Sequence, residues 1–398
     1  MLYRKMPKNE DELSILGFGC MRLPVKDGKI DEERAKQQIR YAIDHGINYI
    51  DTAWPYHMGE SESFLGRTLS DGYRDKVKLA TKLPSWILQN SNDMDKILNA
   101  QLEKLKTDHI DYYLVHGLVG TLWDKMEGLN VLDFLERARQ EGRIINAGFS
   151  FHGSIEDFKR IVDAYPWEFC LIQYNFLDEK NQAGTEGLRY AASKALGVIV
   201  MEPLRGGKLA NPVPPEVQEI WDGAPVKRTP AEWAFRWIWN HPEVTVVLSG
   251  MNEEAHIEEN LRMAGEAYPS SLSDAELQMV REAEHKYREL MKTGCTGCRY
   301  CSPCPSGVDI AGCFEIYDNF YLTGNEKEAK LQYAAKPGAI IRGNVTGYAS
   351  QCIECGQCIE KCPQHLDIPT LLKAVAEEFE GKDHKNWKIL AKKAFGTA

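Results

Sequence analysis

A regular alternation of short apolar runs with helix-length amphipathic segments is the feature that most constrains how this chain can fold. The β-type runs cover residues 15–20, 48–52, 77–82, 111–116, 144–150, 169–175, 197–202 and 244–250, and the helical segments cover 31–45, 60–69, 93–105, 129–140, 155–165, 185–195, 229–240 and 252–264. Such alternation implies a parallel sheet with right-handed crossovers. Eight units, with no GxGxxG after the first run, favour an α/β fold with a closed (β/α)8 TIM barrel over an open doubly wound sheet.

Polar residues follow the predicted strands in series. In a barrel of this kind, the chemistry lies at the carboxyl ends of the strands. Six residues fall at or near successive strand ends, namely Asp51, Lys82, His116, Ser150, Gln173 and Glu202. Any one of them alone is better explained as one of the polar residues that commonly follow strands, but six in series favour a functional site.

Composition limits the classes of partner. Lys and Arg total 48 against 58 for Asp and Glu, a net charge of −10, which argues against nucleic acid because phosphate backbones attract basic surfaces. The first residues turn acidic before any apolar core and show no small-residue cleavage site of a secretory signal. No apolar stretch approaches the roughly 18 residues of a membrane-spanning helix. We therefore expect a cytoplasmic protein with no nucleic-acid or membrane partner.

The chain is expected to divide into a large and a small domain. Residues 1–267 would form the barrel, and residues 268–294 read as a helical linker in which "SLSDAEL" has the pattern of a capping box. Residues 295–398 would form a small, mostly helical cysteine domain.

Nine of the eleven cysteines lie between Cys295 and Cys362. Clustered C-x2-C spacings in a reducing cytosol are more often metal sites than disulfides. The second run reads C-x2-C-x2-C-x3-C-P, the ligand run of bacterial two-cluster ferredoxins, in which the fourth cysteine reaches the other cluster. A zinc knuckle is the alternative, but zinc needs four ligands and rarely uses a third C-x2-C step with a Cys-Pro ending.

The first cysteine run departs from this pattern because only two residues precede its last cysteine, although the Cys-Pro ending is kept. Together the runs predict two [4Fe-4S] clusters, one held by Cys295, Cys298, Cys301 and Cys362, and the other by Cys304, Cys352, Cys355 and Cys358. The remaining cysteines, Cys20, Cys170 and Cys313, are expected to be buried as small apolar residues.

Several segments of the barrel carry a family likeness. "DTAWPYHMGESESFLG", "LATKLP", "DYYLVHGL", "GRIINAGFS", "IQYN" and "ENL" follow one another between Leu13 and Ala264. In this order they resemble the aldo/keto reductases, and the cysteine tail extends the resemblance to the branch with a C-terminal ferredoxin-type domain. The resemblance implies an oxidoreductase that interconverts a carbonyl and an alcohol through a tetrad of Asp51, Tyr56, Lys82 and His116.

The chemistry of these four residue types suits that reaction. Carbonyl reduction needs a proton for the developing alkoxide, and a tyrosine with a pKa of about 10 is a poor acid unless nearby positive charge stabilises its phenolate. Lys82 would supply this charge to Tyr56, and Asp51 would hold Lys82 charged. His116, which in isolation would be read as a core histidine, would here orient the carbonyl oxygen by a hydrogen bond.

The resemblance also implies an NAD(P)H cofactor. The positions that match the family's cofactor site are Ser150 and Gln173 for the carboxamide, Leu204, Gly206 and Lys208 within "LRGGKL" for the pyrophosphate, and Glu259 and Asn260 for the adenine. Two positions depart from the family pattern: Phe151 replaces an Asn, and Met201 replaces an aromatic residue that stacks on the nicotinamide.

Few residues of this sequence are suited to bind the 2′-phosphate of NADPH. Gly250 and His256 stand where the family usually has a Lys and an Arg, and Glu253 and Glu254 add negative charge nearby. A phosphate held without its bidentate Arg loses a charge-assisted contact worth roughly 1.5 to 3 kcal/mol. We therefore expect NADPH to have at most a small advantage over NADH.

Three functions remain open. The tetrad favours an enzyme that acts on a small-molecule carbonyl or alcohol, with clusters that relay electrons to or from a redox-protein partner. The chain could instead be an electron-transfer subunit whose barrel docks a partner, or a reductase whose clusters are structural or redox-sensing.

The barrel and the cysteine domain would transfer different numbers of electrons at a time. A nicotinamide gives two electrons as hydride, whereas a cluster takes one, and coupling the two normally needs an intermediary such as a flavin. No separate flavin motif is recognisable in the sequence. A flavin in the barrel, two uncoupled halves and a different redox chemistry of the barrel all remain open.

Overall fold

The structure, a computed structural model, describes residues 1–211, 213–340 and 346–395. The chain forms two compact units: Met1–Pro203 with Glu232–Asp274, and Leu204–Ala231 with Ala275–Ala398. The expected boundaries at residues 267 and 294 do not coincide with this division. The segment Leu204–Ala231, expected within the barrel domain, groups with the second unit.

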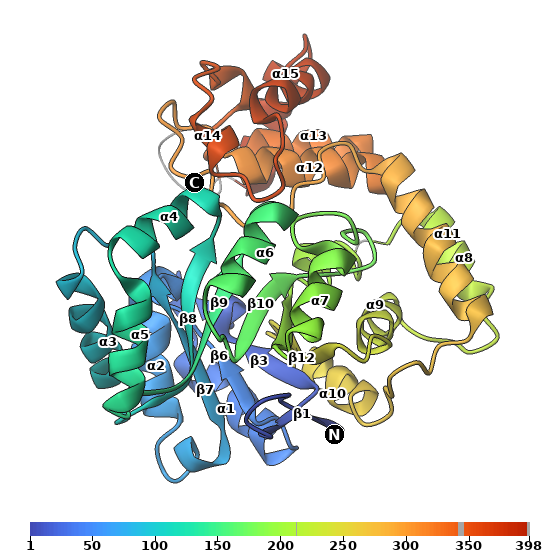
Figure 1. The fold of residues 1–398 in the computed structure, drawn as a ribbon. Coiled ribbons are helices and arrows are strands. Elements are labelled where there is room, and N and C mark those ends of the chain that lie inside the picture. The colour runs from blue at the N-terminus through green and yellow to red at the C-terminus, as the bar shows by residue number, and fades with distance from the viewer. Residues whose placement is uncertain (212, 341–345, 396–398) are drawn as a thin grey trace. The chain divides into compact units, whose positions relative to one another are not determined.

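The first unit is an eight-stranded parallel barrel, which confirms the predicted fold class. Its strands close in the order β3 (Leu16–Gly19), β6 (Tyr49–Asp51), β7 (Lys78–Pro84), β8 (Ile110–Leu118), β9 (Ile144–Phe151), β10 (Phe169–Gln173), β11 (Gly197–Met201) and β12 (Val244–Ser249). Helices surround the strands (Figure 1). They are α1 (Glu32–Asp44), α2 (Glu60–Thr68), α3 (Asn92–Leu105), α4 (Gly120–Gly128), α5 (Val131–Gln140), α6 (Ile155–Ala164), α7 (Gly184–Ser193), α9 (Pro230–Trp239) and α10 (Glu254–Met263).

Two short hairpins, which the sequence analysis did not anticipate, accompany the barrel. They pair β1 (Tyr3–Lys5) with β2 (Glu12–Ser14), and β4 (Val25–Lys26) with β5 (Lys29–Ile30).

Large side chains fill the barrel interior. The rings of Tyr49 and Tyr112 meet edge to face with centroids 5.3 Å apart, and those of Tyr112 and Phe169 meet in the same way at 5.0 Å. Gly148 on β9 leaves room for this packing, because a Cβ at that position would lie 2.4 Å from the Phe169 ring. The interior is therefore a packed core, and it leaves the strand ends to provide a site.

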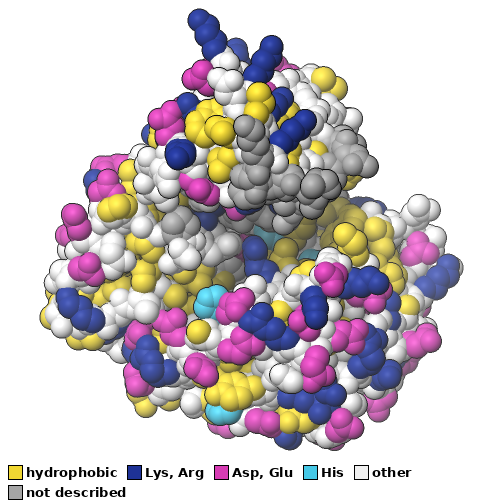
Figure 2. Space-filling view, turned by 180° about the vertical axis from the view of Figure 1, so that it is seen from behind, with side chains coloured by type: hydrophobic (Ala, Val, Ile, Leu, Met, Phe, Trp, Pro, Cys, Tyr) yellow, Lys and Arg dark blue, Asp and Glu magenta, His cyan; other side chains and the backbone are white. Residues whose placement is uncertain are grey.

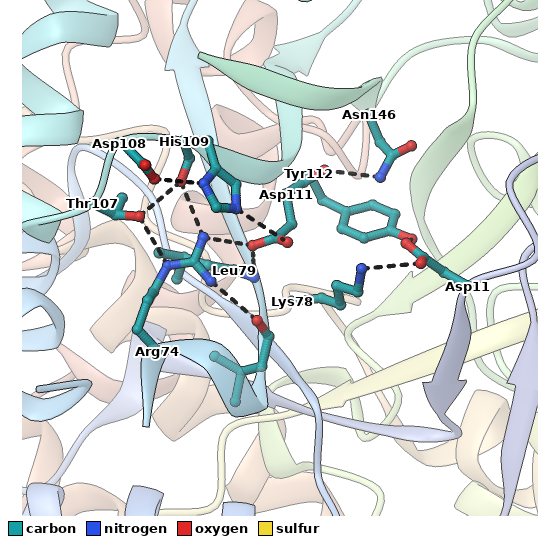
Figure 3. A network of polar contacts seen from close by, with 11 residues as sticks. Asp11, Arg74, Lys78, Leu79, Thr107, Asp108, His109, Asp111, Tyr112 and Asn146 are labelled. Carbon is teal, nitrogen blue, oxygen red and sulfur yellow. Dashed lines mark hydrogen bonds and ion pairs between the residues drawn. The ribbon is translucent and has the colours of Figure 1, made fainter. Parts of the chain in front are cut away.

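A polar network closes the N-terminal end of the barrel (Figure 3). The Arg74 guanidinium donates to the Asp111 carboxylate at 2.7 Å, and Lys78 pairs with Asp11 at 3.0 Å. The Tyr112 hydroxyl donates to Asp11 at 2.8 Å. Because chemistry lies at the opposite end of such barrels, this network serves stability.

The second unit is mostly helical. Its helices are α8 (Pro215–Asp222), α11 (Asp274–Leu290), α12 (Ile310–Thr323), α13 (Glu326–Ala335), α14 (Gln357–Glu360), α15 (Ile368–Phe379) and α16 (His384–Phe395). Its core gathers Phe314, Tyr317, Tyr333 and Phe379, and the last two rings stack with centroids 4.9 Å apart.

A repeated pattern begins two of these helices. Each cysteine run ends in Cys-Pro-x3-Asp-Ile, and α12 and α15 both start at that Ile. Asp309 and Asp367 cap them by accepting hydrogen bonds from the backbone amides of Gly312 and Thr370. Both cysteine runs thus lead into a helix in the same way.

None of the helices in the described ranges combines the length and the apolar character that crossing a membrane requires. Figure 2 shows acidic and basic side chains interleaved over the lower part of one face. The net charge of −10 is therefore not gathered into a single field on that face.

Candidate functional site

Adjacent strands carry three of the four tetrad residues. Asp51 ends β6, Lys82 lies on β7 and His116 on β8. Tyr56 begins a short 3-10 segment, Tyr56–Gly59, in which His57 and Met58 take left-handed conformations with φ of 51° and 56°. Non-glycine residues rarely adopt this region, so the turn beside Tyr56 holds backbone strain of the kind found at functional sites.

Lys82 is the centre of the group. Its Nζ lies 2.6 Å from Asp51 Oδ1 and donates to the carbonyl oxygen of Thr52 at 2.7 Å. Its contact with the hydroxyl of Tyr56 is longer, at 3.4 Å. The side chains of Asp51 and Lys82 are only 3% and 1% exposed, so water competes little for this ion pair.

Burial dominates the acidity of Tyr56. It raises the pKa of the phenol well above its ordinary value of 10, and the nearby Asp51 carboxylate raises it further. Lys82 was expected to offset this effect, but two of its three N–H groups are directed at Asp51 and Thr52. The resting Tyr56 therefore keeps its proton, which is the form that a proton donor needs.

His116 faces the same region as a neutral imidazole. Burial, followed by the charge of Lys82, lowers its pKa well below 6.5. Its ring centroid lies 6.3 Å from that of Tyr56 and 5.0 Å from that of Trp86, which is 40% exposed. Among the described residues, His116 Nδ1 and Asp51 Oδ2 are buried without a hydrogen-bond partner, as expected where a ligand is to bind.

The two residues expected at a nicotinamide carboxamide are both held by neighbours. Ser150 Oγ accepts the backbone N–H of Gly117 at 2.7 Å, which leaves its own O–H to donate. The Gln173 amide donates to Asp178 at 2.8 Å and accepts from Gln182 at 3.0 Å. The pattern of apolar runs gave no signal for Asp178 and Gln182, which come from the loop after β10.

The loop between β12 and α10 is rich in carboxylates. Arg34 of α1 pairs with Glu253 at 2.6 Å and with Glu254 at 2.5 Å. Asn260, expected at the adenine, donates to Ser249 Oγ at 3.0 Å, and the other residue expected there, Glu259, is half-buried. The Arg34 guanidinium is therefore already paired with two carboxylates.

The expected pyrophosphate residues Leu204, Gly206 and Lys208 belong to the second unit. Gly206 has a φ of 71° in a short 3-10 turn, Arg205–Gly207. Lys208 Nζ lies 2.6 Å from Asp318 Oδ2 on α12, a partner that the sequence analysis did not foresee.

The cysteines of the second unit lie around two hollows. Cys295, Cys298, Cys301 and Cys362 line one, together with apolar Ile310, Phe314, Leu366 and Ile368. Cys304, Cys352, Cys355 and Cys358 line the other, which Cys301 also borders. Cys20, Cys170 and Cys313 are fully buried elsewhere, which confirms the expectation for them.

Both cysteine loops turn in the same way. The residue two positions after the first cysteine donates its backbone N–H to that sulfur, from Gly297 to Cys295 at 3.3 Å and from Glu354 to Cys352 at 3.4 Å. Those two residues have φ of 72° and 55°, and the residue after the second cysteine is left-handed in both loops. Loops that bring four cysteines to the lining of one hollow, with a backbone amide donated to a cysteine sulfur, fit a [4Fe-4S] cluster.

Comparison with known proteins extends this description. The family model "Aldo/keto reductase family" matches residues 15–284, and the model "4Fe-4S dicluster domain" matches residues 294–366. An uncharacterised oxidoreductase of Bacillus subtilis, YqkF, is 33% identical over 222 residues, which cover 53% of this chain and 67% of the relative. L-galactose dehydrogenase of Arabidopsis thaliana is 26% identical and covers 63% of this chain and 84% of its own.

Among solved structures, an aldo-keto reductase of Bacillus halodurans in its holo form superposes with a TM-score of 0.60 at 26% identity. The match covers 71% of this chain and 96% of that one.

Proposed function

Because the chain belongs to the aldo/keto reductase family and carries a 4Fe-4S dicluster domain, we propose that it interconverts a small carbonyl compound and its alcohol while two [4Fe-4S] clusters relay electrons. The observation that carries the first part is the buried Lys82–Asp51 pair beside the hydroxyl of Tyr56. A reducing compartment keeps cluster thiolates from forming disulfides, so the proposal includes the cytoplasm.

Each tetrad residue has a distinct task in this proposal. Tyr56 donates the proton to the alkoxide that develops from the carbonyl. Lys82 stabilises the phenolate that remains, since its third N–H faces the Tyr56 hydroxyl at 3.4 Å and can close on it. Asp51 fixes Lys82 in place, and the neutral His116 donates an N–H to the carbonyl oxygen and orients it.

The cofactor of the barrel is proposed to be a nicotinamide dinucleotide, which would supply the hydride when bound. The O–H of Ser150 is available to a carboxamide oxygen, and Gln173 is held rigidly beside it by Asp178 and Gln182. Asn260 and Glu259 would meet the adenine. Transfer between a hydride and clusters that take one electron at a time needs an intermediary that holds two electrons, such as a flavin, and the proposal includes a carrier of this class; analysis of the small molecules extracted from anaerobically purified protein identifies it.

The clusters are proposed to occupy the two hollows. Cys295, Cys298, Cys301 and Cys362 would hold the first cluster, and Cys304, Cys352, Cys355 and Cys358 the second. In the second group Cys355 is exposed, and its neighbour Ile353 is 66% exposed. An exposed ligand beside an exposed apolar side chain supports a redox-protein partner at the second cluster rather than at the first.

Replacing the proton donor tests the catalytic assignment. Tyr56→Phe removes only the hydroxyl and should lower kcat for carbonyl reduction by roughly 10² to 10⁴, the usual scale for a positioned acid. The assay follows NAD(P)H-dependent reduction of a panel of small aldehydes and ketones by anaerobically purified protein. Tyr190→Phe, which removes a hydroxyl bonded to the surface residue Asp163, is the control and should leave kcat unchanged.

The same pair of variants separates the alternatives. Equal activity of Tyr56→Phe and wild type would refute the tetrad mechanism. No carbonyl reduction by the wild type, with clusters that still exchange electrons, would favour an electron-transfer subunit whose barrel docks a partner.

A further inference from the structure

The cationic side chains of the segment Leu204–Leu209 are bonded to other residues of the second unit. Lys208 Nζ lies 2.6 Å from Asp318 Oδ2, and the two side chains are 10% and 0% exposed. The Arg205 guanidinium donates to the carbonyl oxygen of Gly294 at 2.8 Å. One bond ends on α12, the helix that follows the first cysteine run, and the other on Gly294, in the loop directly before Cys295, so the segment from Leu204 to Leu209 is bonded to both sides of the first cysteine run.

Asp318 joins Lys208 to that loop. Its carboxylate accepts the hydroxyl of Thr293 at 2.7 Å and the backbone amides of Thr293 and Lys292 at 2.8 Å and 3.2 Å. Together with Lys208, four donors meet one fully buried carboxylate. These hydrogen bonds hold the Asp318 carboxylate in place, and with it the Lys208 ammonium.

A short path leads from this pair to a cluster ligand. The hydroxyl oxygen of Thr293, which donates to Asp318, accepts the backbone N–H of Cys295 at 3.1 Å. Three hydrogen bonds therefore connect the Lys208 ammonium to the backbone of Cys295. Buried charged groups that lie this close to a cluster and keep a fixed position change its reduction potential.

We propose that Lys208 and Asp318 form a charge pair in the outer coordination sphere of the cluster held by Cys295, where they shift its reduction potential in opposite directions. Reduction adds one negative charge to the cluster. The Lys208 ammonium stabilises that charge and raises the potential, whereas the Asp318 carboxylate lowers it. The inference rests on the proposed function, because it requires the clusters.

A purely structural role makes a different prediction. Removing either partner breaks the same ion pair and loosens the same loop, which would admit water to the cluster in both variants. Both potentials would then move in the same direction, or the cluster would be lost. Opposite shifts distinguish a charge effect from a packing effect.

The test is an anaerobic redox titration, followed by EPR, of wild type and five variants. Lys208→Met should lower one of the two cluster potentials, and Asp318→Asn should raise the same one. The double variant Lys208→Met/Asp318→Asn should return it close to the wild-type value. Lys336→Met, which removes an equal charge from an exposed pair with Glu315 in the same unit, is the control and should shift neither potential.

Iron content is measured on every sample, because it distinguishes failure of the proposed function from failure of the charge-pair inference. A wild type without clusters refutes the proposed function, and the inference with it. Clusters whose potential moves in the same direction in both single variants, or by no more than in Lys336→Met, overturn the charge pair alone. If Lys208→Met loses iron, Asp318→Asn still decides, because its potential must rise, and Lys208→Arg should restore the wild-type value.

Discussion

Tyr56 holds its proton because burial and the Asp51 carboxylate act together on its phenol. The resemblance to the aldo/keto reductases predicted roles for Tyr56 and Lys82, but the sequence could not show which groups the three N–H donors of Lys82 contact. In the structure the two shorter bonds go to Asp51 and to the carbonyl of Thr52. The resting site therefore favours the protonated tyrosine, and in the proposed mechanism Lys82 acts on the phenolate once the proton has left.

The direction of this pKa shift predicts the pH dependence of both reactions. Because the pKa of Tyr56 is raised well above 10, the proton that reduction needs is present at every pH below that value, so kcat for reduction should be flat between about pH 7 and 9. Oxidation of the alcohol needs the phenolate, so its kcat should rise about tenfold per pH unit over the same range. Initial rates in both directions with one carbonyl and alcohol pair provide the measurement, and a plateau for oxidation near pH 7 to 8 would contradict the assignment.

The ion pairs of a single residue, Arg34, also lead to a prediction about the preference between NADPH and NADH. Its guanidinium is paired with Glu253 and Glu254, so it is not available to a 2′-phosphate, and NADPH should bind at most a few times more tightly than NADH. Equilibrium titration of anaerobic protein with each cofactor provides the comparison.

A variant sharpens this prediction. Glu253→Gln/Glu254→Gln releases Arg34 from both carboxylates, and the affinity for NADPH should rise roughly tenfold relative to NADH. Wild-type protein that binds NADPH a hundredfold more tightly than NADH would show that other residues hold the phosphate.

At the scale of elements, close packing of helices imposes its own limits. Gly66 of α2 faces the C-terminal end of α3, where an added Cβ would lie 2.2 Å from the backbone oxygen of Lys104. Because backbone cannot move aside as a side chain can, Gly66→Ala should lower the free energy of unfolding by about 1 to 3 kcal/mol.

Gly128 provides the matched control for that prediction. It is also helical, ends α4, and an added Cβ would meet nothing within 4 Å. Gly128→Ala should leave stability unchanged or raise it by about 0.5 to 1 kcal/mol, since alanine restricts the unfolded chain. Chemical denaturation of both variants gives the comparison, and equal effects would contradict the packing argument.

Elements were predictable where one physical signal was sufficient. Each barrel strand is a short apolar run, and each covering helix has its own apolar stripe, so β8 and α6 lie within a few residues of their predicted bounds. α4 and α8 were missed because they lie in connections where no periodic run marked them. The Gln173–Asp178–Gln182 network was missed because its members come from a loop without a motif.

At the scale of the whole molecule, the segment Leu204–Ala231 is the main departure from the sequence analysis. By sequence it connects β11 to α9 of the barrel, yet it groups with the second unit. The cause is non-local, because Lys208 and Asp318 are 110 positions apart in the chain. Hydrophobic periodicity carries no information about an ion pair at that separation.

The proposed cooperation of the barrel and the clusters in one reaction also concerns the whole molecule. A carbonyl takes up two electrons and two protons to become an alcohol. In the proposed function, two [4Fe-4S] clusters supply one electron each, an intermediary such as a flavin passes the pair with one proton to NAD(P)⁺ as a hydride, and Tyr56 supplies the second proton. The chain therefore has the electron capacity for one turnover, which is the central claim of the electron relay.

The most direct test follows the clusters through a single turnover. Anaerobic protein with about eight irons per chain is reduced with one equivalent of electrons per cluster, freed of reductant, and mixed with a carbonyl substrate and NAD(P)⁺ while EPR monitors the clusters. The account predicts that the cluster signals disappear as about one alcohol per chain is formed, and that in Tyr56→Phe both changes slow by roughly the same factor of 10² to 10⁴. Cluster signals that persist after the carbonyl and NAD(P)⁺ are added, with no alcohol formed, would contradict it.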